Sequence, residues 1–172
     1  YLLKTKKPAR VLEVGTAIGY SALFMRHCLP ETSKITTIEK VEMRLVEARK
    51  NLEKHDKTGQ IELIEGDAVD VLEQLCEDGK TYDFIFMDAA KGQYIHFLPD
   101  VMRLLKVGGI LISDNVLQDG DIIESHYAVE RRNRTIYKRM REYLYELKHN
   151  EHLMTSIVPI GDGATLSVKI KE

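Results

Sequence analysis

Short apolar runs and longer amphipathic stretches alternate along the chain. The runs are rich in Val, Ile, Leu and Phe, and the stretches carry an apolar residue at about every third or fourth position. This alternation is typical of an α/β protein, in which helices cover both faces of a mostly parallel sheet. The pattern predicts strands at 10–14, 34–39, 61–65, 82–87 and 109–113, and helices at 21–29, 41–54, 68–76, 94–105 and 122–148.

Two of these helices show a clear apolar face. The helix at 41–54 places Val41, Leu45, Ala48 and Leu52 on one side. The helix at 122–148 carries at helical spacing Val129, Ile136, Met140, Leu144 and Leu147. The chain then ends in two runs, 152–159 and 164–170, around Gly161-Asp162-Gly163, which predicts a β-hairpin and therefore two antiparallel strands.

Length and composition bound the architecture. A chain of 172 residues with 44% hydrophobic content can bury one core, so we expect a single domain over 1–172. Since the chain opens at Tyr1 and reaches its first strand within about ten residues, we expect that an N-terminal segment is missing. No signal peptide or membrane span is visible. Cys28 and Cys76 are far apart and form no CxxC pair, which fits reduced thiols in the cytoplasm.

The first strand runs into a glycine-bounded turn, Gly15-Thr16-Ala17-Ile18-Gly19. Gly15 allows a sharp bend close to a ligand, and Gly19 lets a helix begin with its free N–H groups facing the same place. A dinucleotide fingerprint needs a further glycine to make room for a pyrophosphate, and this turn lacks it. The turn therefore favours S-adenosylmethionine, with its amino acid end held by Glu13 and the turn. The alternative is an ordinary α/β building block without a ligand.

Acids follow the next two strands, at the sheet edge where ligands of open α/β sheets bind. Glu39 lies twenty positions after Gly19, where a carboxylate can accept both hydroxyls of a ribose, and we prefer this role to that of a charge at a helix N-terminus. Asp67 could contact the adenine edge or cap the next helix, and both interpretations stay open.

The fourth and fifth strands end in a second polar group. Asp88 and Lys91 follow one strand, and Asp114 and Asn115 follow the other. If these strands are neighbours, their ends lie about 4.8 Å apart, and the oxygen ligands can share one magnesium, manganese or calcium ion. The plain alternative is that these residues are ordinary polar strand ends.

Four segments resemble the metal-dependent O-methyltransferases of the catechol and caffeoyl-CoA type, a branch of the Rossmann-like class I methyltransferases. They are Glu13–Ser21, Phe86–Lys91, Ser113–Leu117 and Pro159–Gly163, and the resemblance runs over nearly the whole chain. It implies a seven-stranded sheet of order 3-2-1-4-5-7-6. We also expect a homodimer. The resemblance also implies that Asp88, Asp114 and Asn115 hold the metal and that Lys91 is the base. We therefore assign Lys91 and Asp88 as the catalytic residues. We assign to the cofactor site Glu13, Gly15, Thr16, Ser21, Glu39, Asp67, Ala68 and Asp88.

Within that family, the segments 88–94 and 114–117 are most similar to the bacterial tRNA 5-hydroxyuridine methyltransferases, which form 5-methoxyuridine at the wobble position. 5-Hydroxyuridine presents a hydroxyl beside a carbonyl much as a catechol presents two neighbouring oxygens. Either pair can chelate one ion, which would acidify the attacking hydroxyl. Lys91 would take the proton, and the oxygen would attack the sulfonium methyl group in line.

A basic cluster gives some support to an RNA substrate. A net charge of -2 excludes a globally basic protein but allows a local patch. Arg131, Arg132 and Arg134, followed by Lys138, Arg139 and Arg141, could contact phosphates or form a solvated helix face. Four tyrosines could stack on bases or pack against the body of the protein or a second subunit: Tyr127, Tyr137, Tyr143 and Tyr145.

Three functions are compatible with these features. The first is a tRNA 5-hydroxyuridine methyltransferase, and the second is a small-molecule catechol or acyl-CoA-ester O-methyltransferase. The third is a Rossmann-like binding module without catalysis, which would be expected to lack one of Asp88, Lys91, Asp114 or Asn115. All four are present.

Overall fold

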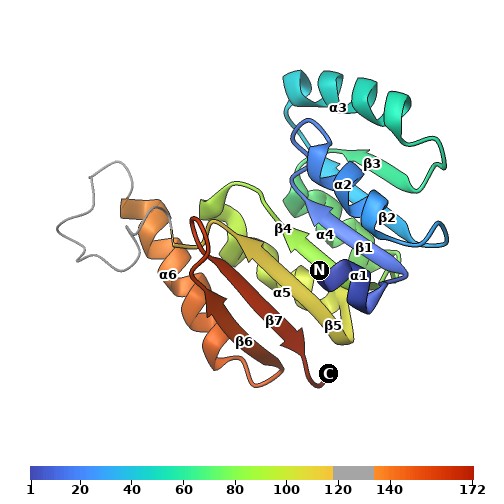
Figure 1. Cartoon of the computed structure of the whole chain (residues 1–172). Coiled ribbons are helices and arrows are strands. Elements are labelled where there is room, and N and C mark those ends of the chain that lie inside the picture. Colours follow the sequence, from blue (N-terminus) through green and yellow to red (C-terminus); the bar gives the residue numbers. More distant parts are fainter. Residues whose placement is uncertain (118–133) are drawn as a thin grey trace.

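The computed structural model describes residues 1–117 and 134–172 and places seven strands in one sheet, in the order β3-β2-β1-β4-β5-β7-β6 (Figure 1). The strands are β1 (Arg10–Val14), β2 (Lys34–Glu39), β3 (Ile61–Glu65), β4 (Tyr82–Met87), β5 (Leu105–Asp114), β6 (Leu153–Val158) and β7 (Ala164–Lys169). The first five pair in parallel, and β7 pairs antiparallel with both β5 and β6. The predicted α/β fold, its strand order and its antiparallel ending are confirmed.

Helices cover both faces of this sheet. They are α1 (Leu2–Lys6), α2 (Tyr20–Cys28), α3 (Glu42–His55), α4 (Ala68–Glu77), α5 (Tyr94–Leu104) and α6 (Arg134–His149), with a 3₁₀ turn, η1 (Lys91–Gln93), before α5. Figure 1 shows α1 and α2 on one face and α4 and α5 on the other. No helix in the described ranges is long and apolar enough to cross a membrane.

Each face of the sheet has its own buried core, because side chains alternate along a strand. In β1, Val11 packs with Met25 and Phe84 on the side of α1 and α2. Leu12 and Val14 point to the opposite side, where α4, α5 and α6 supply the larger core. Glu13 therefore shares the face of Val11, and this fixes where its carboxylate can lie.

Most strand and helix bounds agree with the prediction to within one or two residues, but three differences affect the fold. β5 begins at Leu105 rather than at 109, because the register with β4 shifts between Tyr82 and Phe84 and the strand passes through the expected Gly108-Gly109 turn. The five-residue α1, which buries only Leu3, was not predicted. Val41 was expected on the buried face of α3 but is 40% exposed as the N-cap residue, since the helix begins one position later. The expected helical residues 122–133, Val129 among them, lie outside the described part of the chain.

Candidate active site at the carboxyl edge of the sheet

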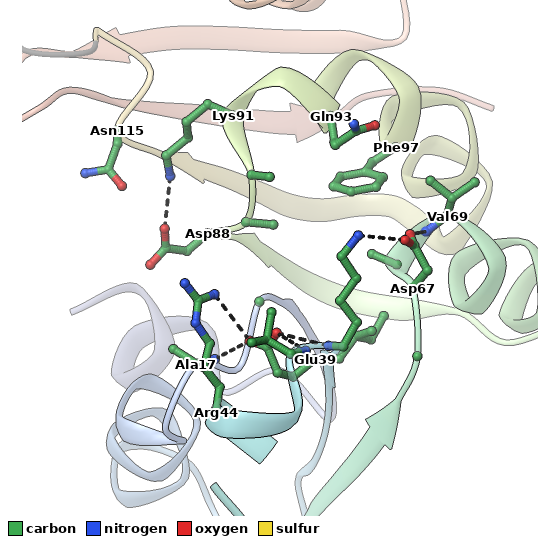
Figure 2. Close-up of a pocket in the computed structure, with 18 residues that line it drawn as sticks. Ala17, Glu39, Arg44, Asp67, Val69, Asp88, Lys91, Gln93, Phe97 and Asn115 are labelled. Atoms are coloured by element: carbon green, nitrogen blue, oxygen red, sulfur yellow. Dashed lines mark hydrogen bonds and ion pairs between the residues drawn. The ribbon is translucent and has the colours of Figure 1, made fainter. Parts of the chain in front are cut away.

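A cavity of about 690 Å³ lies beyond the carboxyl ends of β1, β2, β3 and β4 (Figure 2). Of the predicted site residues, those that line it are Gly15, Glu39, Asp67, Ala68, Asp88, Lys91 and Asn115. Residues from five parts of the sequence thus meet at one place. Glu13, Thr16, Ser21 and Asp114 are not among the lining residues.

Contacts within the protein itself require a glycine at position 15. Its φ of 108° is in the left-handed region, and a Cβ there would lie 2.1 Å from the carbonyl oxygen of Asp88. The N–H groups of Gly15 and Thr16 donate to the carbonyl of Ile38, and the N–H of Asp88 donates to that of Val14. The turn after β1 is therefore held tightly between β2 and β4.

Glu39 joins that turn to the start of α3. Its Oε2 accepts the N–H of Ala17 at 3.0 Å, and its Oε1 accepts the N–H groups of Lys40 and Val41 at 3.0 Å each. Arg44 lies 3.7 Å from Oε2. A carboxylate has about four acceptor positions, so part of this capacity stays for a hydroxyl in the cavity. The contacts at the helix N-terminus thus leave room for one ribose hydroxyl, and the contact with both hydroxyls stays a prediction.

Asp67 is the N-cap residue of α4. Its Oδ1 accepts the N–H of Val69 at 3.0 Å, as the capping interpretation predicts. Its Oδ2 accepts a bond of 2.8 Å from the Nζ of Lys40, which lowers the pKa of Asp67. Lys40 therefore links the end of β2 to the end of β3 at the cavity wall.

Glu13 lies beneath the turn and is fully buried. Its Oε2 accepts from the hydroxyl of Thr37, which also bonds the hydroxyl of Thr16 at 2.7 Å. Burial raises the pKa of Glu13 to about 7, and hydrogen bonds from Ser21 and Thr37 limit the rise. These residues form a buried polar cluster on the α2 side of β1.

The pairing of β4 with β5 brings together the polar residues that follow these two strands. Met87 lies opposite Ser113, so Asp88 and Asp114 follow paired residues, as the sequence predicted for neighbouring strands. The Nζ of Lys91 lies 3.0 Å from Oδ1 of Asp88. Figure 2 shows Asp88, Lys91 and Asn115 together on one side of the cavity and Glu39 on another.

Asn115 has an unusual backbone conformation and a fixed side chain. Its φ is 53°, a left-handed value that asparagine tolerates better than most residues, and its N–H donates to Oδ1 of Asp114 at 2.8 Å. Its Nδ2 donates to Oδ2 of Asp162 at 3.3 Å. The amide oxygen is thereby left as the ligand atom of this side chain.

The donor chemistry of this group suits a hard divalent cation. Within 1–117 and 134–172 no three His, Cys, Asp or Glu side chains gather closely enough to hold an ion, so a metal here would depend on two carboxylates and one amide. Asp88, Asp114 and Asn115 supply only oxygen ligands, which Mg²⁺, Mn²⁺ and Ca²⁺ prefer. These residues therefore fit the ion that the sequence pattern implies.

The predicted basic cluster is only partly within the described residues. Arg131, Arg132 and Tyr127 lie outside them, and Arg134 is the first residue of α6. Arg139 donates to the carbonyl of Gly92 at 3.2 Å and so braces η1. Tyr137 and Tyr143 are buried in the core, whereas Tyr145 is 60% exposed and stacks on His149.

Two residues near the site were not assigned a role from the sequence. Tyr94 lies one turn beyond Lys91 and contacts its amine, and the only signal for it was the i, i+3 spacing. Asp162 was noticed only as part of the hairpin turn. Its approach to Asn115 depends on β7 pairing beside β5.

The strand order and the glycine turn are those of a Rossmann-like methyltransferase. Solved structures agree: the putative caffeoyl-CoA O-methyltransferase from Staphylococcus aureus has a TM-score of 0.88 and 33% identity, over 98% of this chain and 79% of that one. The SAH-bound methyltransferase PaMTH1 from Podospora anserina has a TM-score of 0.86 and 26% identity, over 98% and 75%.

Sequence comparisons are more specific. A model of the family described as O-methyltransferase matches residues 1–170. Caffeoyl-CoA O-methyltransferase 2 from Populus trichocarpa is 35% identical over 181 residues, which cover 99% of this chain and 70% of that protein. Catechol O-methyltransferase from Niastella koreensis is 34% identical over 117 residues, or 67% of this chain and 53% of that protein. The chain belongs to the O-methyltransferase family and is an S-adenosylmethionine-dependent enzyme of its caffeoyl-CoA and catechol type.

Proposed function

We propose that this enzyme methylates one of two adjacent oxygens on a small molecule, a catechol or a caffeoyl-CoA-like ester, with the help of a divalent cation. The observation that carries the proposal is the meeting of Asp88, Asn115 and Lys91 on the wall of one cavity, with Asp114 beside them. The relatives named for caffeoyl-CoA and catechol support this substrate class.

The chain's own residues divide the work between them. Glu39 and the turn at Gly15 hold the cofactor, and Asp88, Asp114 and Asn115 would hold the ion. When bound, the ion would supply Lewis acidity to the substrate hydroxyl. Lys91 removes the hydroxyl proton, and the oxygen electron pair forms a bond to the methyl carbon while the carbon–sulfur bond breaks. The products are the methyl ether, S-adenosylhomocysteine and a proton on Lys91.

A metal-exchange assay tests this function. We expect methylation of a catechol or of caffeoyl-CoA to stop in excess chelator and to return with Mg²⁺ or Mn²⁺, because two carboxylates and an amide form the proposed ligand set. Cofactor binding, measured by calorimetry in the same chelator, is the control and should persist. Full turnover in excess chelator would contradict the metal assignment.

A tRNA containing 5-hydroxyuridine is the second candidate substrate, on the same site and in a cytoplasmic homodimer. Its support is the resemblance of segments 88–94 and 114–117, together with the place where the basic segment joins the fold. The side chain of Ile136, two residues after Arg134, lies 3.7 Å from a Cβ built at Gly92, in the turn that carries Lys91. Arg134, the one arginine of the three within the described residues, therefore begins the helix that packs on the turn of Lys91.

Replacing Arg131, Arg132 and Arg134 together by alanine separates the two substrates. If phosphates bind there, methylation of the tRNA should fall sharply, and the slope of log affinity against log salt should drop by about one per lost duplex contact. Methylation of a small catechol is the control and should persist. Equal losses on both substrates would mean that the arginines support the fold or a dimer.

A further inference from the structure

The hydroxyl of Tyr94 is buried beside the proposed base and has three hydrogen-bond partners. Tyr94 is fully buried, and its hydroxyl oxygen lies 3.0 Å from the Nζ of Lys91, 3.0 Å from the carbonyl oxygen of Met87 and 3.2 Å from that of Asp114. A phenol carries one proton and two acceptor lone pairs, whereas a lysine ammonium can only donate. The tyrosine therefore gives its proton to the two carbonyl groups and accepts from Lys91.

The two carbonyl groups fix the direction of this hydroxyl. Met87 ends β4 and Asp114 ends β5, so the hydroxyl proton faces the point where both strands leave the sheet. The phenol ring cannot turn away, since it meets the ring of Tyr143 edge-on at 5.4 Å between centroids. The accepting lone pair is thus held toward Lys91 before any ligand binds.

Lys91 is held from two sides as a result. Its Nζ contacts Tyr94 and also Oδ1 of Asp88 at 3.0 Å, while the side chain is 21% exposed and lines the cavity. In the neutral amine, which is the form that can take a proton, the two N–H bonds face Tyr94 and Asp88, and the lone pair is left for the cavity. A group held in this way loses little freedom when it has to meet a reacting hydroxyl.

We propose that Tyr94 is the positioning residue of this site, and that its hydroxyl aims the amine of Lys91 at the substrate oxygen. The inference rests on the proposed function for its effect on turnover, but the placement of Lys91 can be measured without turnover. Tyr94 itself is fully buried and is not among the residues that line the cavity.

The variant Tyr94→Phe tests this role, because it removes one oxygen and keeps the buried ring. We expect kcat to fall about 10- to 100-fold, with KM for S-adenosylmethionine within about twofold of the original, because only the base loses its fixed place. The matched control is Tyr82→Phe. Tyr82 is only 2% exposed, and its hydroxyl bonds Thr36 at 3.3 Å, so this change removes another buried hydroxyl outside the site.

A second measurement does not depend on the reaction. Acylation of single lysines by an amine-directed reagent, followed by peptide mass spectrometry, reports how freely each amine moves. Lys91 should react about threefold faster or more in Tyr94→Phe, because it has lost one of two fixed partners, while Lys106 serves as the internal reference. If the original enzyme shows no turnover, the proposed function fails. The labelling still shows whether Tyr94 holds the amine of Lys91 in place. Unchanged labelling of Lys91, or equal kcat losses in both tyrosine variants, would overturn the proposal.

Discussion

The two halves of the cavity are held in different ways. We call the side formed by the ends of β1, β2 and β3 the cofactor half, and the side formed by the ends of β4 and β5 the reacting half. On the side of β1, β2 and β3, the acids already bind backbone N–H groups: Glu39 accepts three and Asp67 accepts one. On the side of β4, the carboxylate of Asp88 contacts an amine that points to the cavity. Backbone N–H groups thus fix most of the carboxylate contacts in the cofactor half, whereas the amine of Lys91 in the reacting half is held by the side chains of Asp88 and Tyr94. This contrast predicts that single substitutions in the two halves affect different measurements.

The largest effect should come from Lys91→Met. Loss of the base should lower kcat by about 10²- to 10⁴-fold, while calorimetry should find cofactor affinity unchanged within about twofold. Lys106→Met is the matched control, since Lys106 pairs with Asp83 at 2.8 Å at the start of β4. A loss of cofactor affinity as large as the loss of kcat would show that the two halves are not independent.

Glu13 lies under the cofactor half of the cavity. Its titration should make the stability of the folded protein depend on pH. Because burial raises its pKa from an ordinary 4.5 to about 7, the folded protein keeps a proton between these values that the unfolded chain has released. The free energy of unfolding should therefore fall as pH rises from 4.5 to 7, by on the order of 3 kcal/mol.

Denaturant unfolding of Glu13→Gln across this pH range measures that contribution. In the variant, the free energy of unfolding should no longer decrease between pH 4.5 and 7, because the glutamine side chain has no proton to release. Glu62→Gln, an exposed substitution on β3, is the control, and its free energy of unfolding should still decrease over this pH range. An identical pH profile in Glu13→Gln would assign the slope to other groups.

The smallest of these effects is expected for Glu39→Ala. Loss of a charge-assisted contact to the ribose should weaken S-adenosylmethionine binding by about 1.5–3 kcal/mol in calorimetry. Glu65→Ala is the control, because Glu65 lies directly opposite Glu39 in the β2–β3 ladder and does not line the cavity. Unchanged affinity in Glu39→Ala would remove this residue from the cofactor site.

Local patterns predicted what depends on neighbours along the chain. The strand at 61–65 was predicted with the bounds it has. The rule that parallel strands end at one edge put Asp88 and Asp114 at the same edge, and the pairing of β4 with β5 makes them follow neighbouring residues. The position of Glu13 required the pleat of β1, since Val11 and Glu13 face the same side. The placement of Tyr94 and Asp162 required contacts between distant segments, and hydrophobic periodicity carries no signal for these contacts.

The pairing of β7 beside β5 also has a consequence for synthesis of the protein. Asp162 and Gly163 contact Asn115 and Val116, so the reacting half needs the turn between β6 and β7 for its final shape. The cofactor half consists of strands made much earlier. On the ribosome, where chains emerge from the N-terminus, the nascent protein can form its glycine turn long before the amide of Asn115 has a partner. If Asn115 serves the reaction as proposed, we expect competence only after the β6–β7 hairpin has left the exit tunnel.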